Sequence, residues 1–215
     1  MRYFDVHTHQ PAIHEEDVAI VNTIVGREED VALEHQTVDY RSCGIHPWYI
    51  YNNVEEHLAR LETLANDSSC VAIGEAGLDK YATVAMDVQK RIFMEQALLS
   101  ERIRKPLIIH CVKAWEDLTD CRKRIRPRMP WIIHGFRGKK ELAAQLVRQG
   151  FYLSFGVRFN PQALWEAWPD HLLVETDDQL VDIRLVYSEI ARALNLTLDN
   201  FCTQIHKNIS ILGIG

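Results

Sequence analysis

Short apolar segments recur along this 215-residue chain and alternate with longer segments of helical periodicity. Segments such as 106–110 (PLIIH) and 131–134 (WIIH) have almost no polar residue before their last position, which is typical of strands buried on both faces of a parallel sheet. The segments that we predict as strands are 3–6, 17–26, 38–45, 70–74, 106–110, 131–134, 151–155 and 172–175.

Helical periodicity fills most of the intervals between these strands, so the chain repeats a strand-then-helix step. Such repeats favour a closed TIM (β/α)8 barrel over an open doubly wound sheet, because no glycine-rich phosphate loop follows the first strand. No helix is expected between the first two strands, so the barrel is compressed in its first third. We expect one domain over residues 1–215, with helices at 27–36, 54–66, 87–104, 115–125, 139–149, 162–167, 181–194 and 198–212. Helical periodicity predicts that Phe93, Ala97 and Leu98 face inward on the helix at 87–104.

Composition and cysteine content favour a cytoplasmic protein. No apolar run approaches the roughly 20 residues of a membrane span, and the N-terminus has no signal-peptide pattern. The five cysteines are odd in number and lack paired metal spacing, which predicts reduced thiols. We expect no membrane partner and no obligate protein partner.

Charge is spread unevenly along the chain. The net charge is −6, which does not suggest a general nucleic-acid binder, but residues 101–140 hold 12 Lys or Arg against 4 Asp or Glu. This excess could mark a surface that faces phosphate. The favoured interpretation is that the arginines and lysine of 122–128 form the solvated face of one helix.

The opening segment Asp5-Val6-His7-Thr8-His9 is a candidate metal-binding strand end. Side chains alternate across a strand, so Asp5, His7 and His9 share one face. Two imidazoles on one face can hold a metal ion, and a carboxylate behind them can orient them. The alternative is that the two histidines are a surface pair without a bound metal. The choice between the two interpretations depends on whether further ligand-type residues follow in the chain.

Further ligand-type residues do follow, at the ends of other predicted strands. Active sites of (β/α)8 barrels form at the C-terminal ends of the strands, so these side chains are expected to converge. Imidazoles and carboxylates without a thiolate pair suit zinc, manganese or magnesium, and the set is large enough for two divalent ions that share Glu75. A metal pair favours hydrolysis. The residues concerned are His7, His9, His46, Glu75, His110, His134, Glu175 and Asp177.

Six short segments contain these ligand-type residues: 5–9 (DVHTH), 44–47 (GIHP), 74–79 (GEAGLD), 106–110 (PLIIH), 134–138 (HGFRG) and 175–177 (ETD). In this order along the chain, they resemble the motifs of the TatD family of metal-dependent hydrolases. They span residues 5 to 177, and Asn208 also fits. The chain departs from the family pattern at Val112 and at Asp178-Gln179, both near the expected substrate pocket.

The resemblance implies a TIM-barrel phosphodiesterase, usually described as a deoxyribonuclease, with two metal ions. It implies that His7, His9, Glu75 and Asp177 hold one ion, and that Glu75, His110 and His134 hold the other. Asp177 would also accept the proton of the attacking water, so Asp177 and Glu75 are the expected catalytic residues. The resemblance places His46 on the substrate side, although it could be a packing histidine before Pro47.

Candidate substrate contacts outside the ligand set are few. Arg137 follows His134, the last residue of the predicted strand at 131–134. It could bind phosphate, or it could be a surface charge. Several aromatic residues could stack on a base, worth about 1–3 kcal/mol per base, or could pack in the core or a lid. These are Trp48, Tyr49, Tyr51 and Phe136.

Three hypotheses for function follow. The leading one is a divalent-metal-dependent hydrolase that cleaves phosphodiester bonds, as a deoxyribonuclease, through a metal-activated water at a dinuclear site. The second is a hydrolase of a small ester, lactone or phosphoester on the same barrel, suggested by the acidic net charge and by Val112. The third is a non-catalytic metal-binding or regulatory barrel. The expected partner is therefore DNA or a small phosphoester.

Overall fold

The structure, a computed structural model, describes residues 1–31, 38–210 and 213. Its eight strands form one sheet in sequence order, and the register is parallel in the pairs β1–β2, β3–β4, β4–β5 and β7–β8. The strands are β1 (Phe4–Thr8), β2 (Val18–Ile24), β3 (Tyr40–Gly44), β4 (Cys70–Asp79), β5 (Leu107–Val112), β6 (Trp131–Ile133), β7 (Phe151–Phe155) and β8 (Leu172–Val174).

The last strand returns to the first. An isolated parallel bridge joins Thr8 to Asp177, directly after β1 and β8. A parallel sheet in sequence order whose last strand meets its first is the topology of the (β/α)8 barrel, so the predicted fold class is confirmed. Among the described residues, no helix has the length and apolarity that crossing a bilayer requires.

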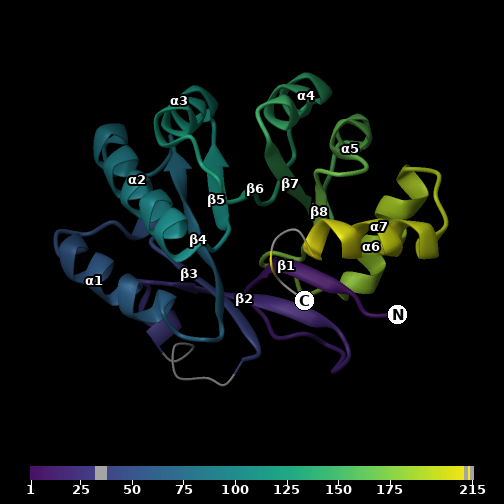
Figure 1. The fold of residues 1–215 in the computed structure, drawn as a ribbon, viewed down its shortest axis with the longest axis horizontal. Coiled ribbons are helices and arrows are strands. Elements are labelled where there is room, and N and C mark those ends of the chain that lie inside the picture. Colours follow the sequence, from purple (N-terminus) through teal and green to yellow (C-terminus); the bar gives the residue numbers. More distant parts are fainter. Residues whose placement is uncertain (32–37, 211–212, 214–215) are drawn as a thin grey trace. The chain divides into compact units, whose positions relative to one another are not determined.

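The chain divides into two compact units. The first unit comprises residues 1–21 and 132–215, and the second comprises residues 22–131. In the second unit, α1 (Val54–Ala65), α2 (Met86–Ile103) and α3 (Trp115–Ile125) follow one another beside β3, β4 and β5 (Figure 1). Helix α2 packs mainly on β4 and also contacts α3.

Helix α2 differs from its prediction in one respect. Phe93 and Ala97 are fully buried as expected, but Leu98 is 51% exposed. Two glutamines, Gln89 and Gln96, take the inward positions instead and are both 1% exposed. They are seven residues apart, which places them on the same face two turns apart. Both side chains are buried because they bind backbone groups, Gln89 at Asp79 and Gln96 at Ile45.

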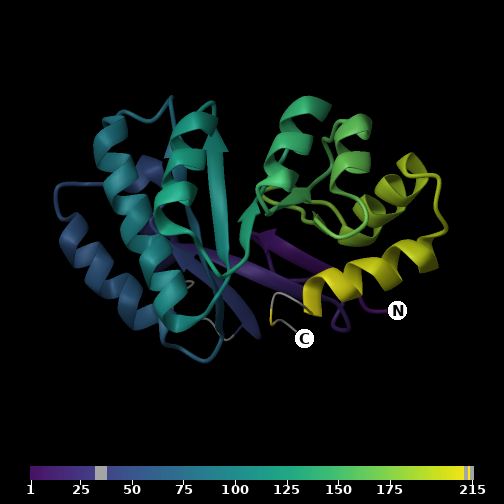
Figure 2. The ribbon, with the colours of Figure 1, turned by 45° about the horizontal axis from the view of Figure 1, so that its top comes forward.

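In the first unit, α4 (Lys140–Arg148) and α5 (Pro161–Ala167) lie side by side, as Figures 1 and 2 both show. Helices α6 (Ile183–Ala193) and α7 (Leu198–Ser210) pack on each other and on β8. The buried Tyr187 of α6 fixes β1, because its hydroxyl lies 3.0 Å from the Phe4 carbonyl oxygen and 3.2 Å from the Phe4 amide nitrogen.

The described residues of the first third of the chain contain little helix. Residues 9–17 join β1 to β2 without a helix, as predicted. The predicted helix over 27–36 lies partly outside the described residues, and its described part is a 3-10 helix, η1 (Glu28–Val31). A second 3-10 helix, η3 (Pro47–Tyr49), follows β3. The predicted end of the last helix, at 211–212, is also outside the described residues.

Candidate metal centre

Strands β1 and β8 bring the first group of ligands together through their backbones. The Asp177 amide donates to the His7 carbonyl at 3.0 Å, and the His9 amide donates to the Asp177 carbonyl at 3.1 Å. Asp177 has a φ of 58°, in the left-handed region that aspartate tolerates better than most residues. The strand pairing thus holds Asp177 between the two histidines.

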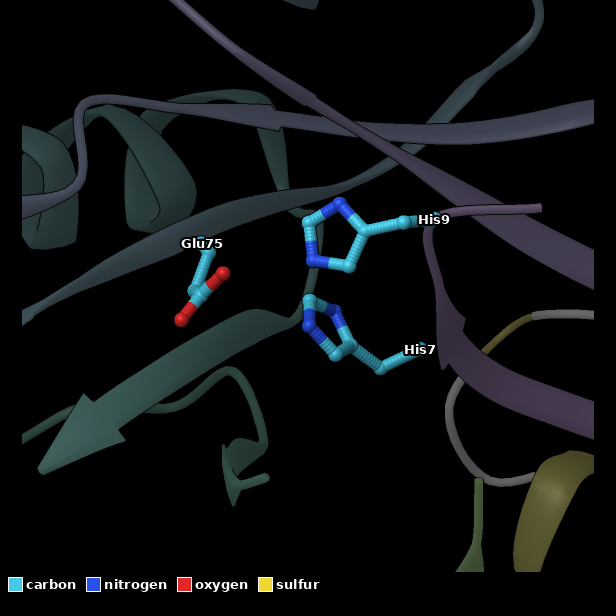
Figure 3. Close-up of side chains that lie close together, drawn as sticks. All are labelled: His7, His9 and Glu75. Atoms are coloured by element: carbon cyan, nitrogen blue, oxygen red, sulfur yellow. The ribbon is translucent and has the colours of Figure 1, made fainter. Parts of the chain in front are cut away.

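The side chains of this first cluster lie within ligand distance of one another. The Nε2 atoms of His7 and His9 lie 3.7 and 3.8 Å from Asp177 Oδ1. One donor atom each of His7, His134 and Asp177 lies within 4.8 Å of the other two. Figure 3 shows the imidazoles of His7 and His9 leaving β1 on the same side, as the alternation in the sequence predicted.

Asp5 fixes the backbone behind this first cluster. Its carboxylate accepts the amide of His7 at 3.3 Å, the amide of Thr176 at 3.1 Å and the hydroxyl of Thr176 at 2.5 Å. Burial raises the pKa of Asp5 to about 8, even though the bonds from Thr176 act in the opposite direction. The residue ties the first ligand strand to the residue before Asp177.

Glu175 supports the loop that follows β6. It is fully buried, and its Oε1 accepts the Gly135 amide at 2.6 Å. The same oxygen lies 3.6 Å from His134 Nδ1. Glu175 therefore holds the ligand loop of β6 against β8.

Strand β4 places Glu75 inside the strand, whereas the prediction had the strand end at Gly74. The register of β4 against β5 shifts between Ile73 and Ala76, which bulges the strand at Glu75. Gly74 has a φ of 141°, and a Cβ atom there would lie 2.5 Å from the Ile108 carbonyl oxygen. Only glycine allows this approach, so the bulge that turns Glu75 depends on Gly74.

A second cluster forms around Glu75 within the second unit (Glu75 is also labelled in Figure 3). Glu75 Oε1 lies 2.9 Å from His110 Nδ1 and 3.4 Å from His46 Nε2. Glu75 and His46 are buried, and one donor atom of each of the three residues lies within 4.8 Å of the others. His46, predicted as a substrate contact, thus lies beside two predicted ligands.

Asn22 orients the Glu75 carboxylate, and the sequence interpretation missed it. Its Nδ2 donates to Glu75 Oε2 at 3.2 Å, and its Oδ1 accepts the Glu75 amide at 2.9 Å. The Ser42 hydroxyl donates to the same Oδ1 at 3.0 Å. Asn22 is a fully buried polar residue in the largely apolar segment VAIVNTI, and that break in the pattern was the available signal.

The two buried glutamines of α2 hold the loops that carry this second cluster. Gln96 accepts the Ile45 amide at 2.7 Å and donates to the Ile45 carbonyl at 3.0 Å, directly before His46. Gln89 makes the corresponding pair with the backbone of Asp79, at 2.8 and 3.0 Å. One helix face therefore fixes the backbone at both positions.

Asp79 orients His110. Its Oδ2 lies 3.1 Å from His110 Nε2 and accepts the indole N–H of Trp48 at 2.7 Å. Burial acts to raise the pKa of Asp79, but hydrogen bonds from the Tyr81 amide, His110 and Trp48 outweigh it, so the pKa lies below its usual range. The ionised carboxylate holds the Nε2 side of the imidazole and leaves Nδ1 directed at Glu75.

Both clusters fit a divalent ion. Imidazole and carboxylate donors bind zinc at about 2.0–2.2 Å, so two donors of one ion are separated by roughly 3–4.4 Å. The separations of His7 and His9 from Asp177, and of His46 and His110 from Glu75, lie in that range or just below it. One donor atom of His134 lies within 4.8 Å of donor atoms of His7 and Asp177. The assignment of His134 to the ion of Glu75 and His110, which the resemblance implies, stays a prediction.

The remaining candidates lie outside these clusters. Arg137 is exposed on the loop after β6. Phe136 is 1% exposed and packs edge-on against Phe155 at 5.7 Å, so it is a core residue with no surface for stacking on a base. Trp48 and Tyr51 are 57% and 50% exposed.

The basic segment 122–128 covers the end of α3. Lys123 pairs with Asp120 at 3.0 Å, and the Arg122 guanidinium lies over the Trp131 ring at 5.4 Å. Lys123, Arg124, Arg126 and Arg128 are exposed, whereas Arg122 is half-buried against Trp131.

Comparison with known proteins identifies relatives of this sequence. The profile of the family described as TatD related DNase matches residues 17–212. The protein named "Uncharacterized metal-dependent hydrolase YabD" of Bacillus subtilis is 35% identical over 154 residues, which cover 67% of this chain and 60% of that protein. The match thus spans less than two thirds of the relative's length.

Solved structures share the fold. The Escherichia coli TatD homologue YJJV superposes with a TM-score of 0.77 at 20% identity, covering 90% of this chain and 85% of the other. A TatD-family hydrolase of Entamoeba histolytica superposes with a TM-score of 0.74 at 16% identity, covering 97% of both chains. At these identities the likeness concerns the fold alone.

Proposed function

Because this chain belongs to the TatD family, whose profile covers residues 17–212, we propose that it is a metal-dependent phosphodiesterase that cleaves DNA. One divalent ion would be held by His7, His134 and Asp177, with His9 beside them. A second would be held by His46, Glu75 and His110. Zinc, manganese and magnesium all suit such donors.

The observation that carries this proposal is the first cluster. Strands β1, β6 and β8 contribute one ligand each, and their donor atoms lie within 4.8 Å of one another. Divalent ions supply a Lewis acid for the phosphoryl group and lower the pKa of water. A tight group of imidazoles and a carboxylate without thiolates is the kind of site that supports this chemistry.

Asp177 and Glu75 have different roles in the proposed reaction. The Asp177 side chain is 21% exposed, so its carboxylate can reach the attacking water and accept its proton. Its backbone bonds to His7 and His9 keep it in position for that transfer. Glu75 is held on one side by Asn22 and on the other by His110, which fixes its carboxylate for the second ion.

The test measures nucleotide release from single-stranded DNA by protein loaded with zinc or manganese. We expect His7→Ala and Asp177→Asn to reduce kcat at least about a hundredfold, the order of magnitude for losing an acid–base group. A matched control is His14→Ala, a histidine of the same unit that pairs with Asp182 at 2.8 Å outside both clusters. Equal activity in wild type and both ligand variants would contradict the proposal.

A second candidate function rests on a cavity of the first unit. A volume of about 330 Å³ next to Asp5, Thr8 and Thr176 is walled mainly by apolar side chains, and it could hold the acyl or alkyl group of a small ester. A panel of p-nitrophenyl esters and phosphoesters, assayed beside DNA, separates the two functions. Turnover of esters without DNA cleavage would favour this candidate. The apolar wall includes Pro11, Ile13, Val18, Leu180, Val181 and Ile183.

A further inference from the structure

Two arginines on neighbouring loops of the first unit line one open cavity. Arg137 follows β6, and Arg158 follows β7, so both lie beyond the C-terminal ends of their strands. The cavity has a volume of about 410 Å³, and Val157, Phe159 and Asn160 complete its lining. This is the end of the strands at which (β/α)8 barrels place their active sites.

The loops that carry the arginines are fixed against the first metal cluster. The Phe136 amide donates to the Ser154 carbonyl at 2.9 Å, and the ring of Phe136 packs on Phe155. Gly135 donates to the Glu175 carboxylate at 2.6 Å, and a Cβ atom on Gly156 would lie 3.5 Å from the Glu175 carbonyl oxygen. Both loops thus rest on the residue two positions before Asp177.

The charge of this cavity is not balanced by the protein. In the part of the chain that the structure describes, neither Arg137 nor Arg158 forms an ion pair, although the protein as a whole is acidic at −6. The nearby Lys140, by contrast, pairs with Glu166 at 3.6 Å. Two unpaired guanidinium groups in one cavity favour an anion, and their fork geometry matches a phosphate.

The other residues that line the cavity indicate a ligand larger than a single inorganic anion. Asn160 Oδ1 accepts the Gln162 amide at 3.0 Å, so its Nδ2 is left as a donor. Phe159 is half-buried and gives the cavity an aromatic wall. A volume of about 410 Å³ lies in the range of small-molecule sites, about 300–1,000 Å³, which is more than one phosphate needs.

We propose that this cavity is a nucleotide subsite, in which Arg137 and Arg158 bind the phosphate next to the scissile one and Phe159 contacts its nucleoside. The inference rests on the proposed phosphodiesterase function and specifies its substrate as a strand with at least two phosphates. Arg158 becomes a specificity-determining residue. A small diester with a single phosphate would not use the subsite.

The test combines binding with two substrates. Binding of a fluorescein-labelled 12-nucleotide single strand is followed by anisotropy in metal-supplemented Asp177→Asn protein, in which cleavage is suppressed. We expect Arg137→Gln and Arg158→Gln to raise Kd about tenfold each, and to reduce the slope of log K against log salt by about 0.7 per lost contact. Arg148→Gln, on an exposed arginine in the last turn of α4, should leave both unchanged.

Hydrolysis of bis(p-nitrophenyl) phosphate separates the subsite from the chemistry. We expect KM for the oligonucleotide to rise in both arginine variants by a much larger factor than any change in their rate on this single-phosphate diester. If Arg137→Gln and Arg158→Gln raise the Kd for the oligonucleotide no more than Arg148→Gln does, the proposed subsite is wrong. Arginine-dependent binding by a protein that hydrolyses neither substrate would support the subsite and reject the proposed function. Arg158→Lys, which keeps the charge without the fork, should give an intermediate Kd.

Discussion

At the scale of single residues, the candidate ligands of the second cluster are oriented by side chains outside the cluster. Asp79 holds His110 Nε2, and Asn22 holds Glu75 Oε2, so each ligand is oriented from behind. Such supporting partners fix the tautomer and direction of a ligand, and their loss typically weakens metal binding about 10- to 100-fold. The ligands alone therefore do not determine the affinity of the site.

The first prediction concerns Asp79. We expect Asp79→Asn to raise the Kd for zinc about 10- to 100-fold, because the amide cannot hold His110 as an anionic acceptor does. Competition with a chromophoric chelator measures this affinity directly. Asp120→Asn, at an exposed carboxylate on α3 that pairs with Lys123 at 3.0 Å, is the matched control and should not change this affinity. Equal affinities for wild type and Asp79→Asn would show that His110 needs no partner.

At the scale of elements, α2 connects the sequence pattern to the site. Its apolar residues pack on β4, while Gln89 and Gln96 bind the backbones of Asp79 and Ile45. A buried backbone group without a partner costs about 1–3 kcal/mol, so these pairs stabilise the loops as well as position them.

The second prediction therefore concerns Gln96. We expect Gln96→Ala to lower the free energy of unfolding by about 1–3 kcal/mol, because the buried Ile45 amide and carbonyl lose their partners. Urea unfolding of the metal-free protein measures this change. Glu95→Ala, on the neighbouring exposed position of the same helix, should alter stability by less than about 0.5 kcal/mol. A similar loss in both variants would mean that the effect comes from the helix and not from the loop.

Elements defined by local pattern could be predicted, and those shaped by tertiary contact could not. The segment at 151–155 coincides with β7, and that at 115–125 coincides with α3, because apolar runs and helical periodicity are properties of neighbouring residues. The bulge at Glu75 was missed because it arises from the approach of Gly74 to Ile108, far away in the sequence. Periodicity also misplaced Leu98, since it treats glutamine as a surface residue.

The candidate site follows the same division. The residues that the structure gathers in each cluster could be predicted from the sequence, because histidines and carboxylates at the ends of apolar strands can be recognised from the pattern alone. The assignment of single residues to one ion or the other rested on the resemblance and stays a prediction, because it depends on which strand ends meet. Asn22 and Asp79 were missed as supporting residues because their role consists of contacts with distant residues.

At the scale of the whole molecule, the two clusters draw on different parts of the chain. His7, His9, His134 and Asp177 belong to the first unit, and His46, Glu75 and His110 belong to the second. If each cluster binds an ion, each can be emptied separately. Metal bound to the folded protein also stabilises it, by about 2.7 kcal/mol at a free concentration of 100 times Kd.

The third prediction is a stoichiometry. We expect about two equivalents of zinc or manganese in wild type by elemental analysis, and about one each in His7→Ala and His110→Ala. Each variant should gain less thermal stability from added metal than wild type, and chelation should bring wild type below its metal-loaded melting temperature. His57→Ala, at a buried histidine of α1 outside both clusters, should keep two equivalents. Loss of both ions in His7→Ala would show instead that the clusters bind as one cooperative site, because separate clusters give independent losses.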